Sequence, residues 1–119
     1  MQSFKNLRVW EKAHELTLHV YQVTKLFPRD ELFGLTSQIR RAAVSVGANI
    51  AEGSCRKGDP EFGRFLYMAM GSASEVEYHL LLARGLELLS EPDYEKLTAE
   101  VKQVKRMLAS LIHKLKAES

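Results

Sequence analysis

The feature that most constrains the fold is the stretch of residues 38–53, QIRRAAVSVGANIAEG. In a helix, successive side chains are rotated by about 100°, which places apolar residues of this region on two opposite faces. One face consists of Leu35, Ile39, Ala42, Val46 and Ile50. The other consists of Val44, Ala48 and Ala51, with Gly47 beside them. A helix that faces water has one apolar stripe and one charged face, so this pattern predicts a helix covered on both sides.

Prolines and glycines divide the chain into four segments with helical periodicity. We expect helices over about residues 7–27, 35–52, 60–89 and 91–116. Pro28 should end the first, because the residue before a proline is pushed out of the α region. Gly53 suits the C′ position of the second helix, where a left-handed conformation is common. Asp59 as N-cap followed by Pro60 is typical of a helix start, and Ser90 should cap the fourth helix.

The fourth segment carries apolar residues at alternating spacings of three and four, which is typical of a coiled-coil seam. The seam consists of Tyr94, Leu97, Val101, Val104, Leu108, Leu111 and Leu115. Because the connections between segments are short, neighbouring helices should run antiparallel. The sequence therefore predicts a single all-α domain over residues 1–119, an antiparallel up-down-up-down four-helix bundle.

Composition favours a cytoplasmic protein. With 17 basic and 15 acidic residues the net charge is +2, which is too balanced to indicate nucleic-acid binding by itself. A single cysteine, Cys55, cannot form an intrachain disulfide and suits a reducing compartment. No stretch approaches the ~20 apolar residues of a membrane span, so we expect no membrane contact.

The charges are distributed unevenly along the chain. Residues 34–58 have four basic and one acidic residue, whereas residues 59–92 have two basic and six acidic residues. A buried carboxylate without a partner is costly. We therefore expect Arg40 or Arg41 of the second helix to pair with Glu75 or Glu77 of the third, as an ion pair that fixes helix packing.

The third segment, like the second, is apolar on two sides. A single bundle buries only one face of each helix, so the second apolar face predicts self-association. If the assembly is a ring, the patch on one subunit should contact a different patch on the next. The candidate subunit interface consists of Val44, Ala48, Ala51, Tyr67, Tyr78 and Leu82.

Basic side chains suggest an alternative, nucleic-acid-binding role. On the fourth helix they fall within roughly 100° of one another, and a basic stripe can follow phosphates. The candidates are Lys102, Lys105, Arg106, His113 and Lys116, together with the loop residues Arg56 and Lys57. A solvated helix face is the simpler interpretation of the stripe.

No constellation of residues indicates catalysis or a cofactor. Glu11 and His14 form half of a di-iron bundle motif, but such sites need two of these motifs and two further carboxylates. Cys55 has no histidine near it in sequence that could act as a base. We expect no metal, no cofactor and no enzymatic activity.

Several motifs match a known family over about residues 4–115. They are Phe4, Leu7, Val9–Trp10, Ala13, Val20–Tyr21, Thr24, Phe27–Pro28, Gly34–Leu35, QIRRAAVSVGANIAEG, Arg56, Phe62, Phe65–Leu66, Gly71–Ser72 and Glu75. The chain resembles the 23S rRNA intervening-sequence protein family, also called the four-helix bundle protein family. The resemblance implies a small bacterial cytoplasmic protein that assembles as a homopentameric ring.

The resemblance also implies partners. Related bundles are accessory proteins of diversity-generating retroelements, which bind nucleic acid and a reverse transcriptase. We therefore expect a non-enzymatic, ring-forming scaffold or interaction module, whose partners are other copies of itself and, by this relation, RNA, DNA, a reverse transcriptase or another protein. The alternative is a nucleic-acid-binding accessory protein that uses the basic stripe of the fourth helix.

Overall fold

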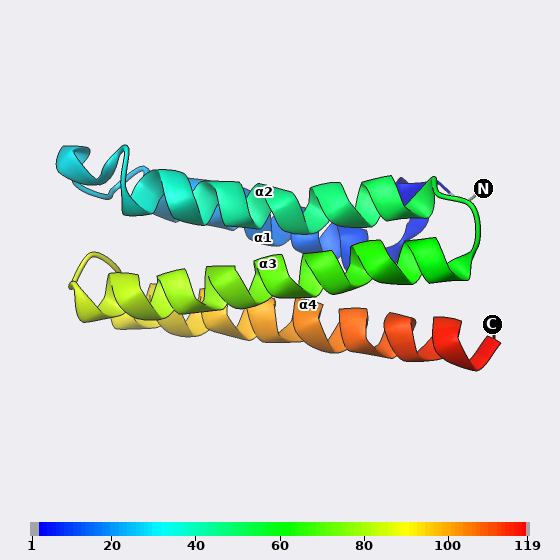
Figure 1. Ribbon diagram of the computed structural model, residues 1–119. Helices are drawn as coiled ribbons and strands as arrows, with labels where there is room; N and C mark the ends of the chain where they lie inside the picture. The colour runs from blue at the N-terminus through cyan, green and yellow to red at the C-terminus, as the bar shows by residue number, and fades with distance from the viewer. Residues whose placement is uncertain (1–2, 119) are drawn as a thin grey trace.

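The computed structural model describes residues 3–118, which form an antiparallel four-helix bundle (Figure 1). Helix α1 spans Arg8–Thr24, α2 spans Leu35–Ser54, α3 spans Asp59–Gly85 and α4 spans Glu91–Glu118. Two short 3-10 turns, η1 at Phe4–Asn6 and η2 at Arg29–Glu31, precede α1 and α2. No strand occurs within residues 3–118, and the all-α bundle prediction is confirmed.

The two ends of the bundle differ in their connections. The α1–α2 and α3–α4 connections lie at the same end, and the α2–α3 connection lies at the other end, beside the start of α1 and the end of α4 (Figure 1). The bundle measures 46 × 22 × 20 Å. None of the helices described here combines the length and the apolar character needed to cross a bilayer.

The core is built from one apolar stripe of each helix. The predicted inner face of α2 is buried along its whole length: Leu35, Ile39, Ala42, Val46 and Ile50. From the other three helices, the largest fully buried side chains include Leu16, Leu66, Leu80 and Leu108. Burial of one such side chain contributes about 1.5–3 kcal/mol, so these stripes hold the four helices together.

The seam of α4 shifts by one residue near its end. Residues Leu97, Val101, Val104 and Leu108 are buried as predicted. The next buried residue is Ile112, whereas Leu111 and Leu115 are only half-buried. A straight α-helix drifts by about 20° per heptad relative to a seven-residue repeat. The strict heptad prediction is therefore wrong for the last two turns of α4.

Helix α1 ends at Thr24, about three residues earlier than predicted. Beyond it the amides of Leu26 and Phe27 donate to carbonyls three residues back, at 3.1 Å each, which is a tighter turn than an α-helix. The Phe27 side chain thereby enters the core. Its burial explains why the apolar pattern extended past the helix.

Helix α3 ends at Gly85 rather than near Leu89. Glu87 has a φ of 61°, and the amide of Leu88 donates to the carbonyl of Ala83 at 2.9 Å. This is the Schellman arrangement, in which the left-handed position is usually glycine. After it, the Ser90 Oγ accepts a hydrogen bond from the amide of Asp93 at 3.2 Å, which confirms the predicted cap of α4.

The α2–α3 connection corrects two predictions. Gly53 is buried inside α2, which continues to Ser54, so Gly53 is not the left-handed residue after the helix. The positive φ, 83°, belongs to Gly58. Helix α3 begins at Asp59, with Gly58 in the capping position, so Asp59 is a helical residue and not the N-cap. Pro60 lies in the first turn as expected.

Candidate interaction surfaces

Large apolar side chains lie exposed on the outside of α2 and α3. Val44 exposes 46% of its surface, Tyr67 52% and Tyr78 58%. Of the other residues of the predicted subunit interface, Ala48 is exposed, while Ala51 and Leu82 are half-buried. The core positions of both helices are filled by other residues, so the bundle itself does not cover this set. Val44 lines a groove with Tyr21 of α1, whereas Tyr67 lines a pocket with Ile112 and Leu115 of α4. The exposed residues therefore form separate apolar patches, and such patches are typical of interaction surfaces.

Small residues of α2 allow its neighbours to pack closely. A Cβ on Gly53 would lie 2.6 Å from the Cβ of Phe65 and 3.1 Å from the Cδ1 of Phe62, both on α3. Carbon atoms in contact are about 3.5–4.0 Å apart, so a side chain does not fit at this position. Gly47 faces α1 instead, because a Cβ there would lie 3.5 Å from the Nε1 of Trp10. The sequence showed these glycines but not what lies against them.

The two arginines of α2 do not pair with α3. Arg40 donates from its Nε to the Thr24 Oγ1 at 2.8 Å, and its guanidinium carbon lies 4.6 Å from the centre of the Tyr21 ring. Arg41 is exposed on the same helix. Among residues 3–118, no ion pair joins either arginine to a carboxylate. The predicted α2–α3 ion pair is therefore wrong.

Glu75 and Glu77, the expected partners on α3, lie near other side chains. Glu77 accepts a hydrogen bond from the Lys105 Nζ of α4 at 2.9 Å, with about a third of each side chain exposed. Glu75 is exposed and lies 3.9 Å from the Nε2 of His79 on its own helix. Glu77 does have the partner that its burial requires, but it faces α4 and not α2.

The basic stripe of α4 is partly occupied by contacts within the chain. Lys105 pairs with Glu77, and the Lys116 Nζ lies 5.2 Å from the centre of the Tyr67 ring. The remaining members, Lys102, Arg106 and His113, are exposed. They extend over roughly 16 Å of helix, so the stripe offers fewer free cations than the sequence suggested.

The α2–α3 connection is exposed and holds the other basic candidates. Arg56 pairs with Glu52 one turn earlier, and its guanidinium carbon lies 5.0 Å from the centre of the Phe65 ring. Lys57 is exposed. Cys55 is a free, exposed thiol whose Sγ lies 3.3 Å from the carbonyl oxygen of Glu52.

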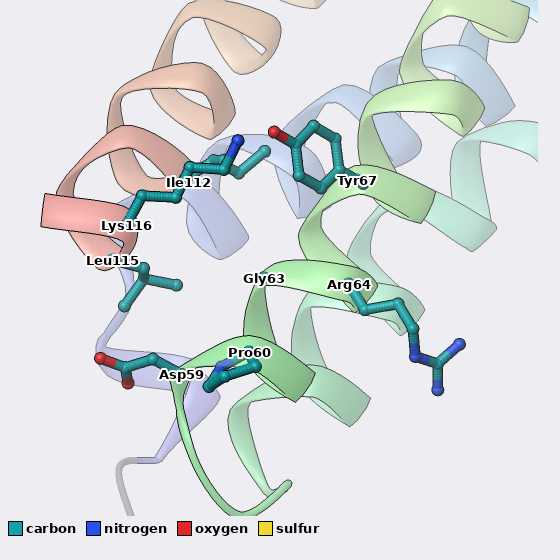
Figure 2. Close-up of a pocket in the computed structure, with 8 residues that line it drawn as sticks. All are labelled: Asp59, Pro60, Gly63, Arg64, Tyr67, Ile112, Leu115 and Lys116. Atoms are coloured by element: carbon teal, nitrogen blue, oxygen red, sulfur yellow. The ribbon is translucent and has the colours of Figure 1, made fainter. Parts of the chain in front are cut away.

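A half-open pocket of about 400 Å³ lies between the start of α3 and the end of α4 (Figure 2). Its lining is mainly apolar and includes Ile112 and Leu115 of α4. Charged groups of both signs lie at its edge, with Asp59 on one side and Arg64 pointing away from the α4 residues on the other. Arg64 Nε donates to Glu61 at 2.7 Å, and this bond holds the pKa of the Glu61 carboxyl below its usual 4.5. The pocket therefore has no dominant charge.

Two adjoining grooves lie at the opposite end, beside the α1–α2 connection. Their volumes are about 530 and 270 Å³, and they share Leu32, Thr36 and Arg40. The basic side chains that line them are Lys25, Arg29, Arg40 and Arg41. No carboxylate is among the lining residues, and Phe33 at the edge is 93% exposed. Sequence reasoning missed this site, although an apolar Leu32–Phe33 pair inside a short charged connection was a signal.

The histidines do not form a metal centre. His14 stacks on Trp10, with 5.0 Å between ring centres, and Glu11 is exposed. Within residues 3–118, no three side chains of metal-ligating type gather at one point. His79 is buried, and its Nδ1 has no hydrogen-bond partner among these residues. The apolar pattern of α3 did not indicate this burial.

Comparisons with known proteins identify the family. Residues 5–110 match the family model described as 23S rRNA-intervening sequence protein. The chain is also similar to a crystal structure, at 1.70 Å resolution, of a protein with unknown function from the S23 ribosomal protein family of Bacteroides thetaiotaomicron VPI-5482. The two are 28% identical, with a TM-score of 0.81, over 87% of this chain and 97% of that one.

No curated protein has a sequence similar enough to match the chain. Neither the description of the family nor that of the solved relative names an enzymatic activity. The family match extends over most of the sequence, including all of α1, α2 and α3. The chain therefore belongs to the 23S rRNA-intervening sequence protein family.

Proposed function

We propose that the protein is a self-associating helical scaffold of the cytoplasm that assembles into a closed ring, with five subunits the expected number. The observation that carries this proposal is the exposed apolar set on α2 and α3, above all Val44, Tyr67 and Tyr78. An exposed free thiol, Cys55, is compatible with a reducing compartment. A ring of this kind offers a repeated surface on which an RNA or a protein partner, such as a reverse transcriptase, can be held.

The energetic gain from covering the two tyrosines is substantial. An aromatic side chain buries about 150–250 Å² in total, and each tyrosine is roughly half exposed. Covering them removes on the order of 100 Å² each, which contributes about 2–3 kcal/mol apiece. Two such residues near the centre of a contact have the character of hot spots, which are often tyrosines.

Sedimentation equilibrium at micromolar concentration tests the assembly. We expect a mass near five times the subunit mass of 13.5 kDa. Tyr78→Ser should weaken self-association, whereas Leu18→Ser, which changes a 50% exposed residue on α1, should not. A wild-type protein that sediments as a 13.5 kDa monomer would refute the proposal.

Nucleic-acid binding is the second candidate function. The observation that favours it is the exposure of Lys102, Arg106 and His113 on α4 without ion-pair partners among residues 3–118. Filter binding to RNA and DNA at two salt concentrations is the test. Each phosphate contact that is lost should lower the slope of log affinity against log salt by about one, so Lys102→Gln with Arg106→Gln should lower it by about two. No detectable affinity at low salt would remove this candidate.

A further inference from the structure

We infer that the basic grooves at the α1–α2 end receive the acidic α3–α4 turn, residues 86–95, of a neighbouring copy of this chain. The inference rests on the self-association proposed above and identifies the two halves of the contact. Here the basic groove means the two adjoining grooves lined by Lys25, Arg29, Arg40 and Arg41. The acidic turn contains four carboxylates and no basic residue.

The groove holds one arginine ready to bind a carboxylate. The Nε of Arg40 is bound to Thr24, whose own hydroxyl donates to the carbonyl of Val20 at 2.7 Å, and the guanidinium is stacked on Tyr21. The terminal nitrogens of Arg40 make no hydrogen bond or ion pair with another side chain among residues 3–118. A guanidinium that is already fixed loses less conformational entropy when it binds a planar anion. Arg41 adds a second, exposed charge beside it.

The apolar part of the groove shows that the occupant is not a simple anion. Phe33 is 93% exposed, and Leu32 and Val44 are each 46% exposed. A small anion would neutralise the arginines and leave these side chains in water. The occupant must therefore bring carboxylates and apolar groups together. Val44 also belongs to the outer face of α2, so the groove is continuous with the proposed subunit interface.

The acidic turn has this combination of groups. Leu86 is 51% exposed at its start. Glu87 and Glu95 are exposed and have no ion-pair partner among residues 3–118, whereas Glu91 lies 3.5 Å from Arg84. Leu86 follows Leu82 by one turn, so the acidic turn continues the outer face of α3. The two halves thus extend the α2 patch of one subunit and the α3 patch of the next.

The position of both halves at one end of the bundle fits a ring. Figure 1 shows the α1–α2 and α3–α4 connections at the same end. In a cyclic assembly whose symmetry axis is parallel to the bundles, the α1–α2 ends of all subunits lie at the same height along the axis. The groove of each subunit can therefore contact the acidic turn of its neighbour. Such a contact is heterologous, and a heterologous contact forms a ring when the rotation between neighbouring subunits closes. Within one chain, no ion pair among residues 3–118 joins the groove to the turn.

Charge reversal and its rescue test the contact. Arg41→Glu is the disrupting variant, because Arg41 is exposed and makes no ion pair that folding would lose. Arg8→Glu is the matched control, since it makes the same charge change at an exposed position at the start of α1, at the other end of the bundle and outside the proposed binding surfaces. In sedimentation equilibrium, Arg41→Glu should weaken self-association roughly tenfold or more, because like charges then face each other. The control should assemble as the wild type does, and circular dichroism should show equal helicity for both.

The rescue reverses the charge of the acidic turn. The double variant Glu87→Lys with Glu95→Lys should by itself weaken assembly. Adding Arg41→Glu to that chain should restore much of the assembly, because opposite charges then face each other again. If the wild type assembles and Arg41→Glu assembles as well as Arg8→Glu does, the groove is not the contact, and the proposed scaffold function is unaffected. Assembly that is unaffected together with a loss of RNA binding in Arg41→Glu would assign the groove to nucleic acid and overturn the inference. A monomeric wild type would overturn both proposals.

Discussion

Substitution of Gly53 tests how α2 and α3 are packed. In Gly53→Ala the new Cβ meets the Cβ of Phe65 at 2.6 Å. The Phe65 Cβ is fixed to the backbone and cannot rotate away, so the two helices must separate by several tenths of an ångström or more. Overpacking of this kind costs about 1–3 kcal/mol. Against this, alanine in a helix is favoured over glycine by about 1 kcal/mol.

Gly71→Ala is the matched control. Gly71 lies inside α3, and a Cβ there has no neighbour within 4 Å. The gain in helix propensity is at most about 1 kcal/mol in either variant, and it is smaller for Gly53, which lies one residue before the end of α2. A larger loss of stability in Gly53→Ala therefore reports the overpacking. We expect Gly71→Ala to be more stable than wild type by up to about 1 kcal/mol. Gly53→Ala should be about 1–3 kcal/mol less stable than Gly71→Ala.

Urea unfolding followed by circular dichroism measures the difference. Both variants are compared at equal protein concentration, and at two concentrations, because association of the native state adds to apparent stability. The wild-type value lies between them if the overpacking exceeds the propensity gain. Equal free energies of unfolding for Gly53→Ala and Gly71→Ala would show that α2 and α3 are not in close contact at Gly53.

Three further predictions concern helix ends and one titrating group. Glu87→Gly should be more stable than Glu87→Ala by about 1–2 kcal/mol in urea unfolding, because both lack the carboxylate and only glycine relieves the positive φ. A Glu87→Gly protein that is no more stable than Glu87→Ala would contradict this. Ser90→Ala should cost about 0.5–2 kcal/mol in urea unfolding through loss of the cap, whereas Ser110→Ala on the exposed side of α4 should cost less. Folding lowers the pKa of Glu61, so its stabilising pair with Arg64 is present above about pH 4.5 and is lost as the pH falls further; in an NMR titration Arg64→Gln should raise that pKa, and an unchanged value would refute the cause.

The sequence by itself determined the class of fold. The inner face of α2 and the first four buried positions of α4 follow from periodicity, because a residue's rotation about its own helix axis depends only on its number. The cap at Ser90 is equally local, since donor and acceptor are three residues apart. The periodicity of the sequence likewise predicted the outer apolar faces of α2 and α3, which the core of a single bundle does not bury.

Local patterns were less reliable at the ends of helices, where the same residues can form either a helix or a turn. The apolar pattern ran past Thr24 because Phe27 is buried by a turn and not by a helix. Gly53 and Gly58 are both plausible left-handed residues, and only Gly58 adopts that conformation. The choice depends on α3, which presses against Gly53 and keeps α2 helical beyond it.

Only the tertiary structure decided which helix each side chain meets. Glu77 needed a cation, and a helical wheel cannot say whether α2 or α4 supplies it; the bundle places Lys105 there. Arg40 likewise contacts Thr24 and Tyr21 of α1 and not a carboxylate of α3, because the packing of the helices places α1 beside it. Periodicity fixes the direction of a side chain around one axis, whereas its partner depends on the packing of four axes at once. The basic groove at the α1–α2 end arises from that packing, which is why the sequence alone did not reveal it.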